Sequence, residues 1–95
     1  MSIIKKIAVY FSSLPVRRAY IFGSYARKEN TRKSDIDILI DIDYSNKVSL
    51  LDFIGWKIDL EKLLNKKVDL VAEDGLSPHI RPYIEREKKM IYEKG

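Results

Sequence analysis

Residues 35–42 read DIDILIDI, and this alternation decides the fold. Successive side chains of a β-strand point to opposite faces, so isoleucine at every second position gives one apolar face. The opposite face carries Asp35, Asp37 and Asp41. We therefore expect a strand here, with its isoleucines in a core and its aspartates on a polar face.

Helical and strand patterns alternate on both sides of this strand. Upstream, apolar spacings of three and four predict a helix over 3–11, alternation predicts a strand over 16–22, and Ser24 is the expected N-cap of a short helical turn. Downstream, the patterns predict a helix over 49–65, a strand over 66–72, a helix over 79–88 and a strand over 90–92. We expect one α/β domain of the α+β type over 1–95. Its small mixed sheet would have about four strands, covered by helices mainly on one face, in a strand order that the sequence leaves open.

The expected helix over 49–65 has two apolar stripes. One stripe is Leu51, Ile54 and Ile58, and the other comprises Phe53, Trp56, Leu60, Leu63 and Leu64. One stripe must cover the sheet, and the other must meet a second helix or a partner protein. We expect partner recognition through the helix that bears Trp56 or through the C-terminal segment.

Composition excludes several kinds of protein. The 95 residues are 45% hydrophobic and 34% charged, which suits a folded chain. The absence of cysteine and the single histidine exclude a disulfide framework, a thiolate nucleophile and a zinc site of cysteines and histidines. No apolar run approaches the ~20 residues of a membrane span. We expect a cytoplasmic protein that does not bind membranes.

The aspartates of the central strand predict a cation site. Asp35 and Asp37 lie two apart on a strand, so their Cα atoms are about 6–7 Å apart and their carboxylates repel each other. Asp69 lies on the strand expected over 66–72, and it completes a three-carboxylate site if the two strands are neighbours. Such a site needs about two divalent cations of the hard, oxygen-binding type, which points to Mg²⁺ and phosphoryl transfer.

A second motif predicts phosphate binding next to that cation site. Gly23 and Ser24 join a strand to a helical turn, where glycine allows close approach and backbone N–H groups with a hydroxyl hold phosphate. Arg27 either contacts phosphate or pairs with Glu29 or an aspartate. Each motif alone is common, and their combination is far more specific.

With these residues, the chain resembles the minimal nucleotidyltransferases of the DNA polymerase beta superfamily. The motif is Gly-Ser, about ten residues, then Asp-x-Asp, which is Gly23-Ser24 followed by Asp35-Ile36-Asp37. The segment KKVDLV is similar to the family's third-carboxylate strand and carries that role onto Asp69. One departure is Lys28, where relatives usually have glycine, which we expect to alter the turn without removing a ligand.

The resemblance implies a polymerase beta-like nucleotidyltransferase fold and metal-dependent transfer of a nucleoside monophosphate from an NTP to a hydroxyl. We expect ATP as donor, and a tyrosine of a HEPN-type toxin as acceptor, so that the enzyme acts as antitoxin. Asp35 and Asp37 would hold the Mg²⁺ at the triphosphate, and Asp37 and Asp69 the second ion at the attacking hydroxyl. Asp69 is the expected general base, and Ser24 would orient the β and γ phosphates.

Two other functions compete with catalysis. The chain could neutralise a toxin by contact alone, which the second apolar stripe and the small size favour. A net charge of +4 with Arg17, Arg18, Arg32 and Lys33 would also permit nucleic-acid binding. We do not favour nucleic acid, because three carboxylates without metals repel a phosphate backbone.

Overall fold

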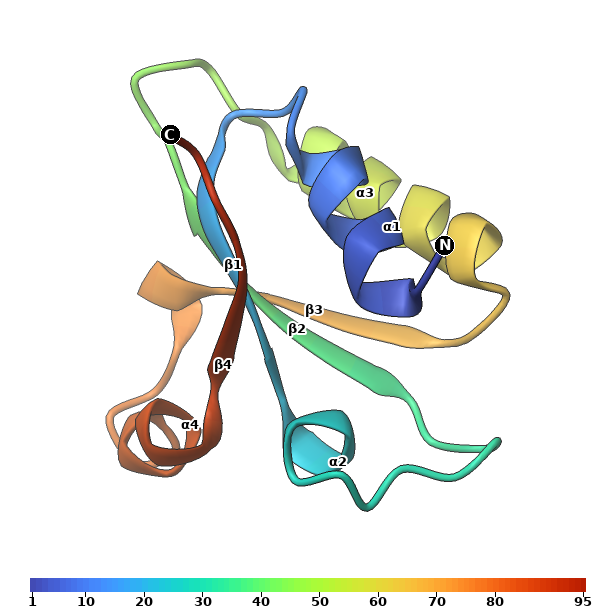
Figure 1. Cartoon of the computed structure of the whole chain (residues 1–95). Coiled ribbons are helices and arrows are strands. Elements are labelled where there is room, and N and C mark those ends of the chain that lie inside the picture. Colours follow the sequence, from blue (N-terminus) through green and yellow to red (C-terminus); the bar gives the residue numbers. More distant parts are fainter.

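The computed structural model describes all residues 1–95 as four strands with helices on both sides (Figure 1). In chain order, the elements are α1 (Ile3–Phe11), β1 (Val16–Phe22), α2 (Gly23–Ala26), β2 (Ile36–Ile42), α3 (Leu50–Leu64), β3 (Val68–Ala72), the 3₁₀ turn η1 (Glu73–Gly75), α4 (Arg81–Glu87) and β4 (Lys89–Glu93). None of the helices is both long and apolar enough to cross a bilayer. The α+β class and the mixed four-stranded sheet expected from the sequence are confirmed.

The sheet has the order β3-β2-β1-β4, with β2 in its interior. β2 pairs antiparallel with β1, where Phe22 lies opposite Asp37, and parallel with β3, where Asp37 lies opposite Asp69. β4 pairs antiparallel with the other edge of β1. The expected neighbourhood of the two aspartate-bearing strands is therefore confirmed, and it places their carboxylates on adjacent strands.

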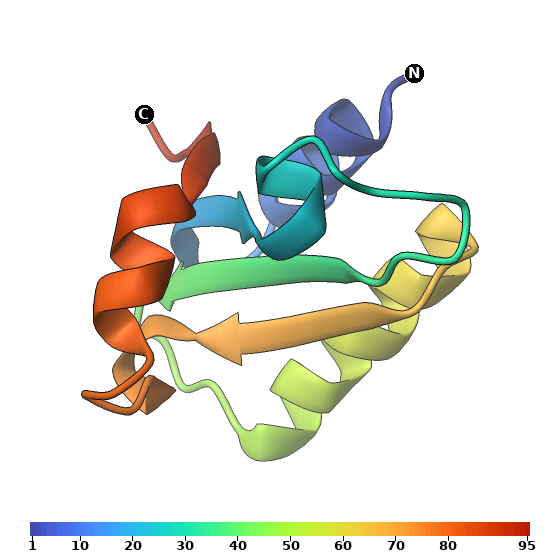
Figure 2. The ribbon, with the colours of Figure 1, turned by 90° about the horizontal axis from the view of Figure 1, so that it is seen from below.

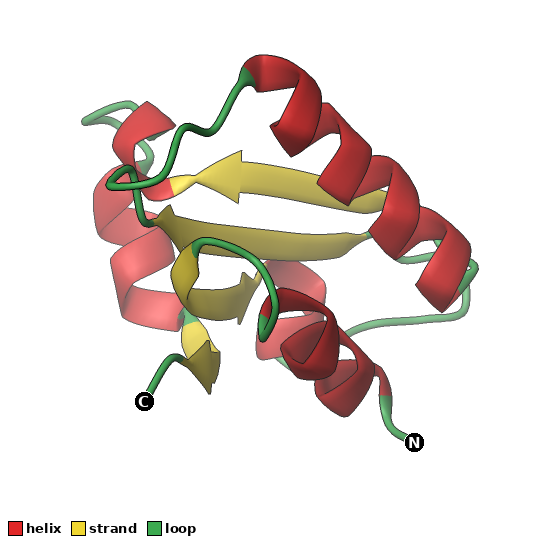
Figure 3. Ribbon diagram, turned by 90° about the horizontal axis from the view of Figure 1, so that it is seen from above, coloured by secondary structure: helices red, strands yellow, loops and turns green.

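The two longer helices, α1 and α3, pack on the isoleucine face of β2 (Figure 3). Ile36, Ile38 and Ile40 are fully buried there, with Phe11 of α1 and Leu60 of α3. A polar contact also joins the two helices, because the Tyr10 hydroxyl donates a hydrogen bond of 2.8 Å to Asp59. This layer leaves the aspartate face of β2 to the shorter elements.

Helix α3 begins and ends with specific caps. Ser49 and Asp52 form a reciprocal capping box at its N-terminus, and Asn65 takes a left-handed conformation (φ 53°) at its C-cap. These caps confirm the expected extent of the helix.

The stripe of α3 that covers the sheet is the one with Trp56. Trp56 is only 7% exposed and belongs to the core, so recognition of a partner through this helix, which stays a prediction, would use its other stripe. The other stripe faces solvent, with Leu51 80% exposed and Ile54 43% exposed. We call Leu51, Ile54 and Ile58 the α3 stripe.

Helices α2 and α4 lie on the opposite face of the sheet, where part of β2 and β3 stays uncovered (Figure 2). Helix α2 begins at Gly23, and its N-cap is Phe22, without a side-chain bond. The prediction of Ser24 as N-cap is wrong, because the helix begins at Gly23 and its N-cap, Phe22, lies two residues before Ser24. Helix α4 is shorter than expected: it begins at Arg81, since Pro82 fits the first turn of a helix.

Candidate active site

Asp37 and Asp69 are direct neighbours on the open face of the sheet. They are register partners in parallel strands, whose backbones lie about 4.8 Å apart, so their side chains point to the same side. Asp35 lies just before β2, two residues from Asp37, and acts electrostatically on it. The structure thus pairs Asp37 with Asp69 and places Asp35 near enough to act on Asp37, whereas a single metal site of three carboxylates stays a prediction.

Gly23 forms the wall of this site at the end of β1. Its φ of +69° lies in the left-handed region, which favours glycine, and a Cβ atom at this position would overlap the Asp37 carboxylate. The close approach of Gly23 backbone to Asp37 therefore depends on the missing side chain. The close contact here is with a carboxylate, and it puts the Gly-Ser motif beside the acidic side chains, whereas the expected phosphate contact stays a prediction. We call Gly23, Arg27, Asp35, Asp37 and Asp69 the acidic corner.

A residue that no sequence motif marks, Glu87, enters the acidic corner from α4. The Glu87 carboxylate accepts a hydrogen bond of 2.8 Å from the Gly23 N–H and one of 3.0 Å from the Arg27 guanidinium. Arg27 also pairs with Glu29 at 3.2 Å, as the sequence analysis allowed. Glu87 ends a short helix and follows no recognisable motif, so only the fold reveals its place.

The electrostatics of the acidic corner are unfavourable to Asp37. Partial burial raises the pKa of Asp37, and the charges of Asp69 and Asp35 raise it further. Arg27 acts in the opposite sense, because its positive charge favours the ionised form, and Glu87 adds to the rise. The site thus holds excess negative charge that a bound cation would relieve.

The donor set of the acidic corner fits Mg²⁺ that arrives with phosphate. As they stand, the side chains form no group of three or more acidic, histidine or cysteine residues arranged to hold a metal ion. Mg²⁺ in phosphoryl-transfer sites is commonly held by one or two carboxylates together with substrate phosphates and waters. The paired Asp37 and Asp69, with the charge excess at Asp37, supply the carboxylates of such a site.

Two further polar side chains, on β2 and in the loop before it, have structural partners. Asp41 shares the face of Asp37 but forms an ion pair with Arg18 at 3.2 Å. The Ser34 hydroxyl accepts a hydrogen bond from the Thr31 N–H, which closes the turn before β2. Asp37 and Asp69, near the start of β2 and β3, form no ion pair or hydrogen bond of this kind.

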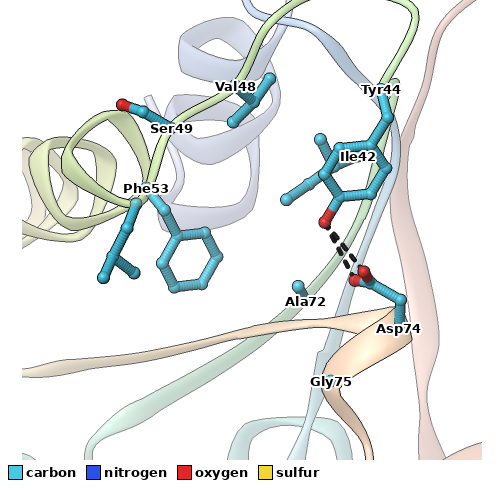
Figure 4. Close-up of a pocket in the computed structure, with 9 residues that line it drawn as sticks. Ile42, Tyr44, Val48, Ser49, Phe53, Ala72, Asp74 and Gly75 are labelled. Atoms are coloured by element: carbon cyan, nitrogen blue, oxygen red, sulfur yellow. Dashed lines mark hydrogen bonds between the residues drawn. The ribbon is translucent and has the colours of Figure 1, made fainter.

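Neither of the two surface hollows lies at the acidic corner. One, of about 280 Å³, is lined by Ile42, Val48, Phe53 and Ala72, and at its rim the Tyr44 hydroxyl is hydrogen-bonded to Asp74 (Figure 4). The other adjoins it and is lined by charged residues that include Arg17 and Arg81. Both lie at the C-terminal ends of β2 and β3. The acidic corner lies at the other ends of these two strands.

Comparison with known proteins agrees with this geometry. The family model for polymerase beta nucleotidyltransferases matches residues 5–95. The chain is 43% identical over 72 residues to the protein adenylyltransferase MntA of Thermococcus cleftensis, covering 76% of this chain and 71% of that protein.

Solved structures share the fold. A chain in the crystal structure of a toxin–antitoxin with AMP-PNP matches with a TM-score of 0.80 and 22% identity, covering 96% of this chain and 73% of its own length. A chain in the complex of the tri-AMPylated Shewanella oneidensis HEPN toxin with MNT antitoxin matches with a TM-score of 0.73 and 20% identity, covering 97% and 71%. At these identities, the matches establish the architecture alone.

Proposed function

Because the chain belongs to the polymerase beta nucleotidyltransferase family, and is a nucleotidyltransferase, we propose that it transfers AMP from ATP to a tyrosine hydroxyl of a HEPN-type toxin and acts as its antitoxin. The donor, the metal and the acceptor belong to this proposal. The relative MntA, which is named a protein adenylyltransferase, supports the transfer of AMP to protein. The fold shared with a HEPN toxin complex and with a complex containing AMP-PNP supports the partner and the nucleotide.

One observation carries the proposal: Asp37 and Asp69 are register partners beside a glycine whose missing side chain leaves room for the Asp37 carboxylate. Three aspartates on one surface repel each other unless cations bind, and strands ordinarily disfavour aspartate. A structural role for all three is therefore costly. A role in holding Mg²⁺ with a triphosphate accounts for their position, because a cation offsets the mutual repulsion that contributes to the raised pKa of Asp37.

The residues of the acidic corner divide the reaction between them. Asp35 and Asp37 face the triphosphate side, while Arg27, the Ser24 hydroxyl and the nearby backbone N–H groups orient the phosphates. Asp69 accepts the proton of the attacking hydroxyl, whose oxygen forms a bond to the α-phosphorus as the bond from that phosphorus to the β-phosphate oxygen breaks. Pyrophosphate leaves. Mg²⁺, when bound, neutralises charge that develops on the α-phosphate and on the leaving group.

The α3 stripe is the surface that we assign to the partner. Leu51 and Ile58 are exposed, at 80% and 44%, on the helix that also carries the exposed Ile54. Apolar side chains that share one helix face in this way are typical of contact surfaces. The expected recognition through the helix that bears Trp56 would therefore use this stripe, not the buried Trp56 itself.

The test is transfer of label from α-labelled ATP to a cognate HEPN protein in Mg²⁺. We expect labelling by the wild type, loss of labelling with EDTA and loss in the double variant Asp35→Asn/Asp37→Asn. Asp41→Asn is the control for the type of substitution, because it removes one negative charge from the same face of β2 outside the acidic corner. Mass spectrometry of the partner should find the mass of AMP on tyrosine. Equal labelling by the double variant would overturn the proposal.

The exposed α3 stripe also favours a second function, in which the chain masks the toxin by contact alone. The same variants separate the two functions. Under masking, Asp35→Asn/Asp37→Asn still neutralises the toxin while Leu51→Glu does not. Under catalysis, the double variant fails to neutralise.

A further inference from the structure

Glu87 occupies the groups that our proposed function assigns to the nucleotide. Its two carboxylate oxygens accept from the Gly23 N–H at 2.8 Å and from Arg27 at 3.0 Å. A phosphate oxygen needs donors of the same kind, a backbone N–H and a guanidinium. A carboxylate and a phosphate therefore compete for this pair of donors.

The surroundings of Glu87 argue against a purely structural role. It lies next to Asp37, and its charge disfavours the ionised form of that neighbour. A fourth carboxylate therefore adds to the repulsion among the acids that are expected to bind metal. A neutral side chain would pack at this position with less repulsion. An anion, in contrast, satisfies the Gly23 N–H and the Arg27 guanidinium when no phosphate is bound.

The Glu87 side chain can leave without unfolding its helix. It is the last residue of α4 and is followed by the extended Lys88. Its side chain is 27% exposed, so solvent already reaches it, and a rotamer change would free both donors. Arg27 would then keep Glu29, at 3.2 Å, as a partner while it turns to a phosphate.

We propose that Glu87 is a built-in competitor of the polyphosphate chain, which holds the Gly23 and Arg27 donors in the free enzyme and must be displaced before a nucleotide binds. This inference rests on the proposed function only in naming the nucleotide as the source of the polyphosphate. The need to displace Glu87 lowers the apparent affinity, because the apparent Kd is the intrinsic Kd divided by the fraction of molecules in which Glu87 has left the two donors. If Glu87 holds the donors in about nine molecules in ten, its removal tightens binding about tenfold.

The test compares Glu87→Gln with Glu85→Gln in the full chain. Glu85 lies on the same helix and pairs with Lys88 at 2.9 Å, so its variant makes the same charge change away from the Gly23 donor. Calorimetric titrations use inorganic tripolyphosphate with Mg²⁺, and AMP-PNP with Mg²⁺. We expect Glu87→Gln to bind both ligands about tenfold more tightly than wild type, and Glu85→Gln to bind within about twofold of wild type. If Glu87→Gln unfolds at the temperature of the titration, Glu87→Ala takes its place, and we expect the same tightening of binding.

The outcomes distinguish a failure of this inference from a failure of the proposed AMP transfer. Equal or weaker binding by both Glu87 variants overturns the competitor role, whether or not the wild type transfers AMP. Equal tightening by Glu85→Gln overturns it too, because general charge would then explain the effect. Tighter tripolyphosphate binding by Glu87→Gln in a protein that transfers no AMP retains the competitor and overturns the proposed function.

Discussion

Replacing Gly23 with alanine tests the close approach on which the acidic corner depends. The φ of +69° costs a residue with a side chain about 1–2 kcal/mol, and the new Cβ overlaps the Asp37 carboxylate. Alanine also makes the unfolded chain less flexible than glycine does, which offsets about 0.4–1 kcal/mol of this cost. With displacement of Asp37 added, we expect a loss of about 1–3 kcal/mol in the free energy of unfolding. The melting temperature falls by about 4–8 °C for each kcal/mol.

The effect of Gly23→Ala on AMP transfer should exceed its effect on stability. A misplacement of about 1 Å at reacting groups costs about 100-fold in rate, and Asp37 has to move because Gly23 lies against it. Urea unfolding followed by Trp56 fluorescence gives the stability, and labelling at a temperature where the variant is folded gives the rate.

Gly55→Ala is the matched control. Gly55 lies inside α3 with open space around it, so alanine should stabilise by about 0.5–1 kcal/mol and leave the rate unchanged. Wild-type stability and rate in Gly23→Ala would refute the reasoning.

Three other predictions follow from particular residues. Burial and nearby carboxylates raise the pKa of Asp37 above its ordinary value of 3.8. Protonated Asp37 therefore contributes fully to stability below pH 3.8, and this contribution is lost as the pH rises through the pKa in the folded state. In metal-free buffer, Asp37→Asn should therefore gain stability over wild type across that rise, and a pH-independent difference in urea midpoints would contradict this. Lys28 has φ 60°, so Lys28→Gly should stabilise by about 0.5 kcal/mol, whereas a lower urea midpoint would show that the turn is unstrained. Trp56→Ala should lower the free energy of unfolding by about 3–5 kcal/mol. Leu51→Glu should change it by less than about 0.5 kcal/mol and weaken partner binding in calorimetry. The reverse pattern would show that the Leu51 stripe covers the sheet and the Trp56 stripe binds the partner.

The local patterns of the sequence were strong enough to predict most elements. The isoleucines of β2 leave one arrangement that buries them, and Ser49 with Asp52 specifies where α3 begins. Lys28 stands where relatives usually have glycine, and its left-handed φ gives the physical reason for that preference.

The remaining features depend on tertiary contacts that no local pattern contains. Both stripes of α3 are apolar, and the one that covers the sheet was decided by packing against β2. The pairing of Asp37 with Asp69 needs the strand order, which the sequence leaves open. Glu87 reaches Gly23 across 64 positions of the chain, so its role depends on how α4 returns over the sheet.

The measurement that bears most directly on the central claim is where a divalent ion binds with nucleotide. Mn²⁺ added in small amounts with AMP-PNP broadens the amide NMR signals of residues near the metal. We expect broadening centred on Gly23, Asp37 and Asp69. Broadening centred instead on Tyr44 and Asp74, at the opposite ends of β2 and β3, would contradict it.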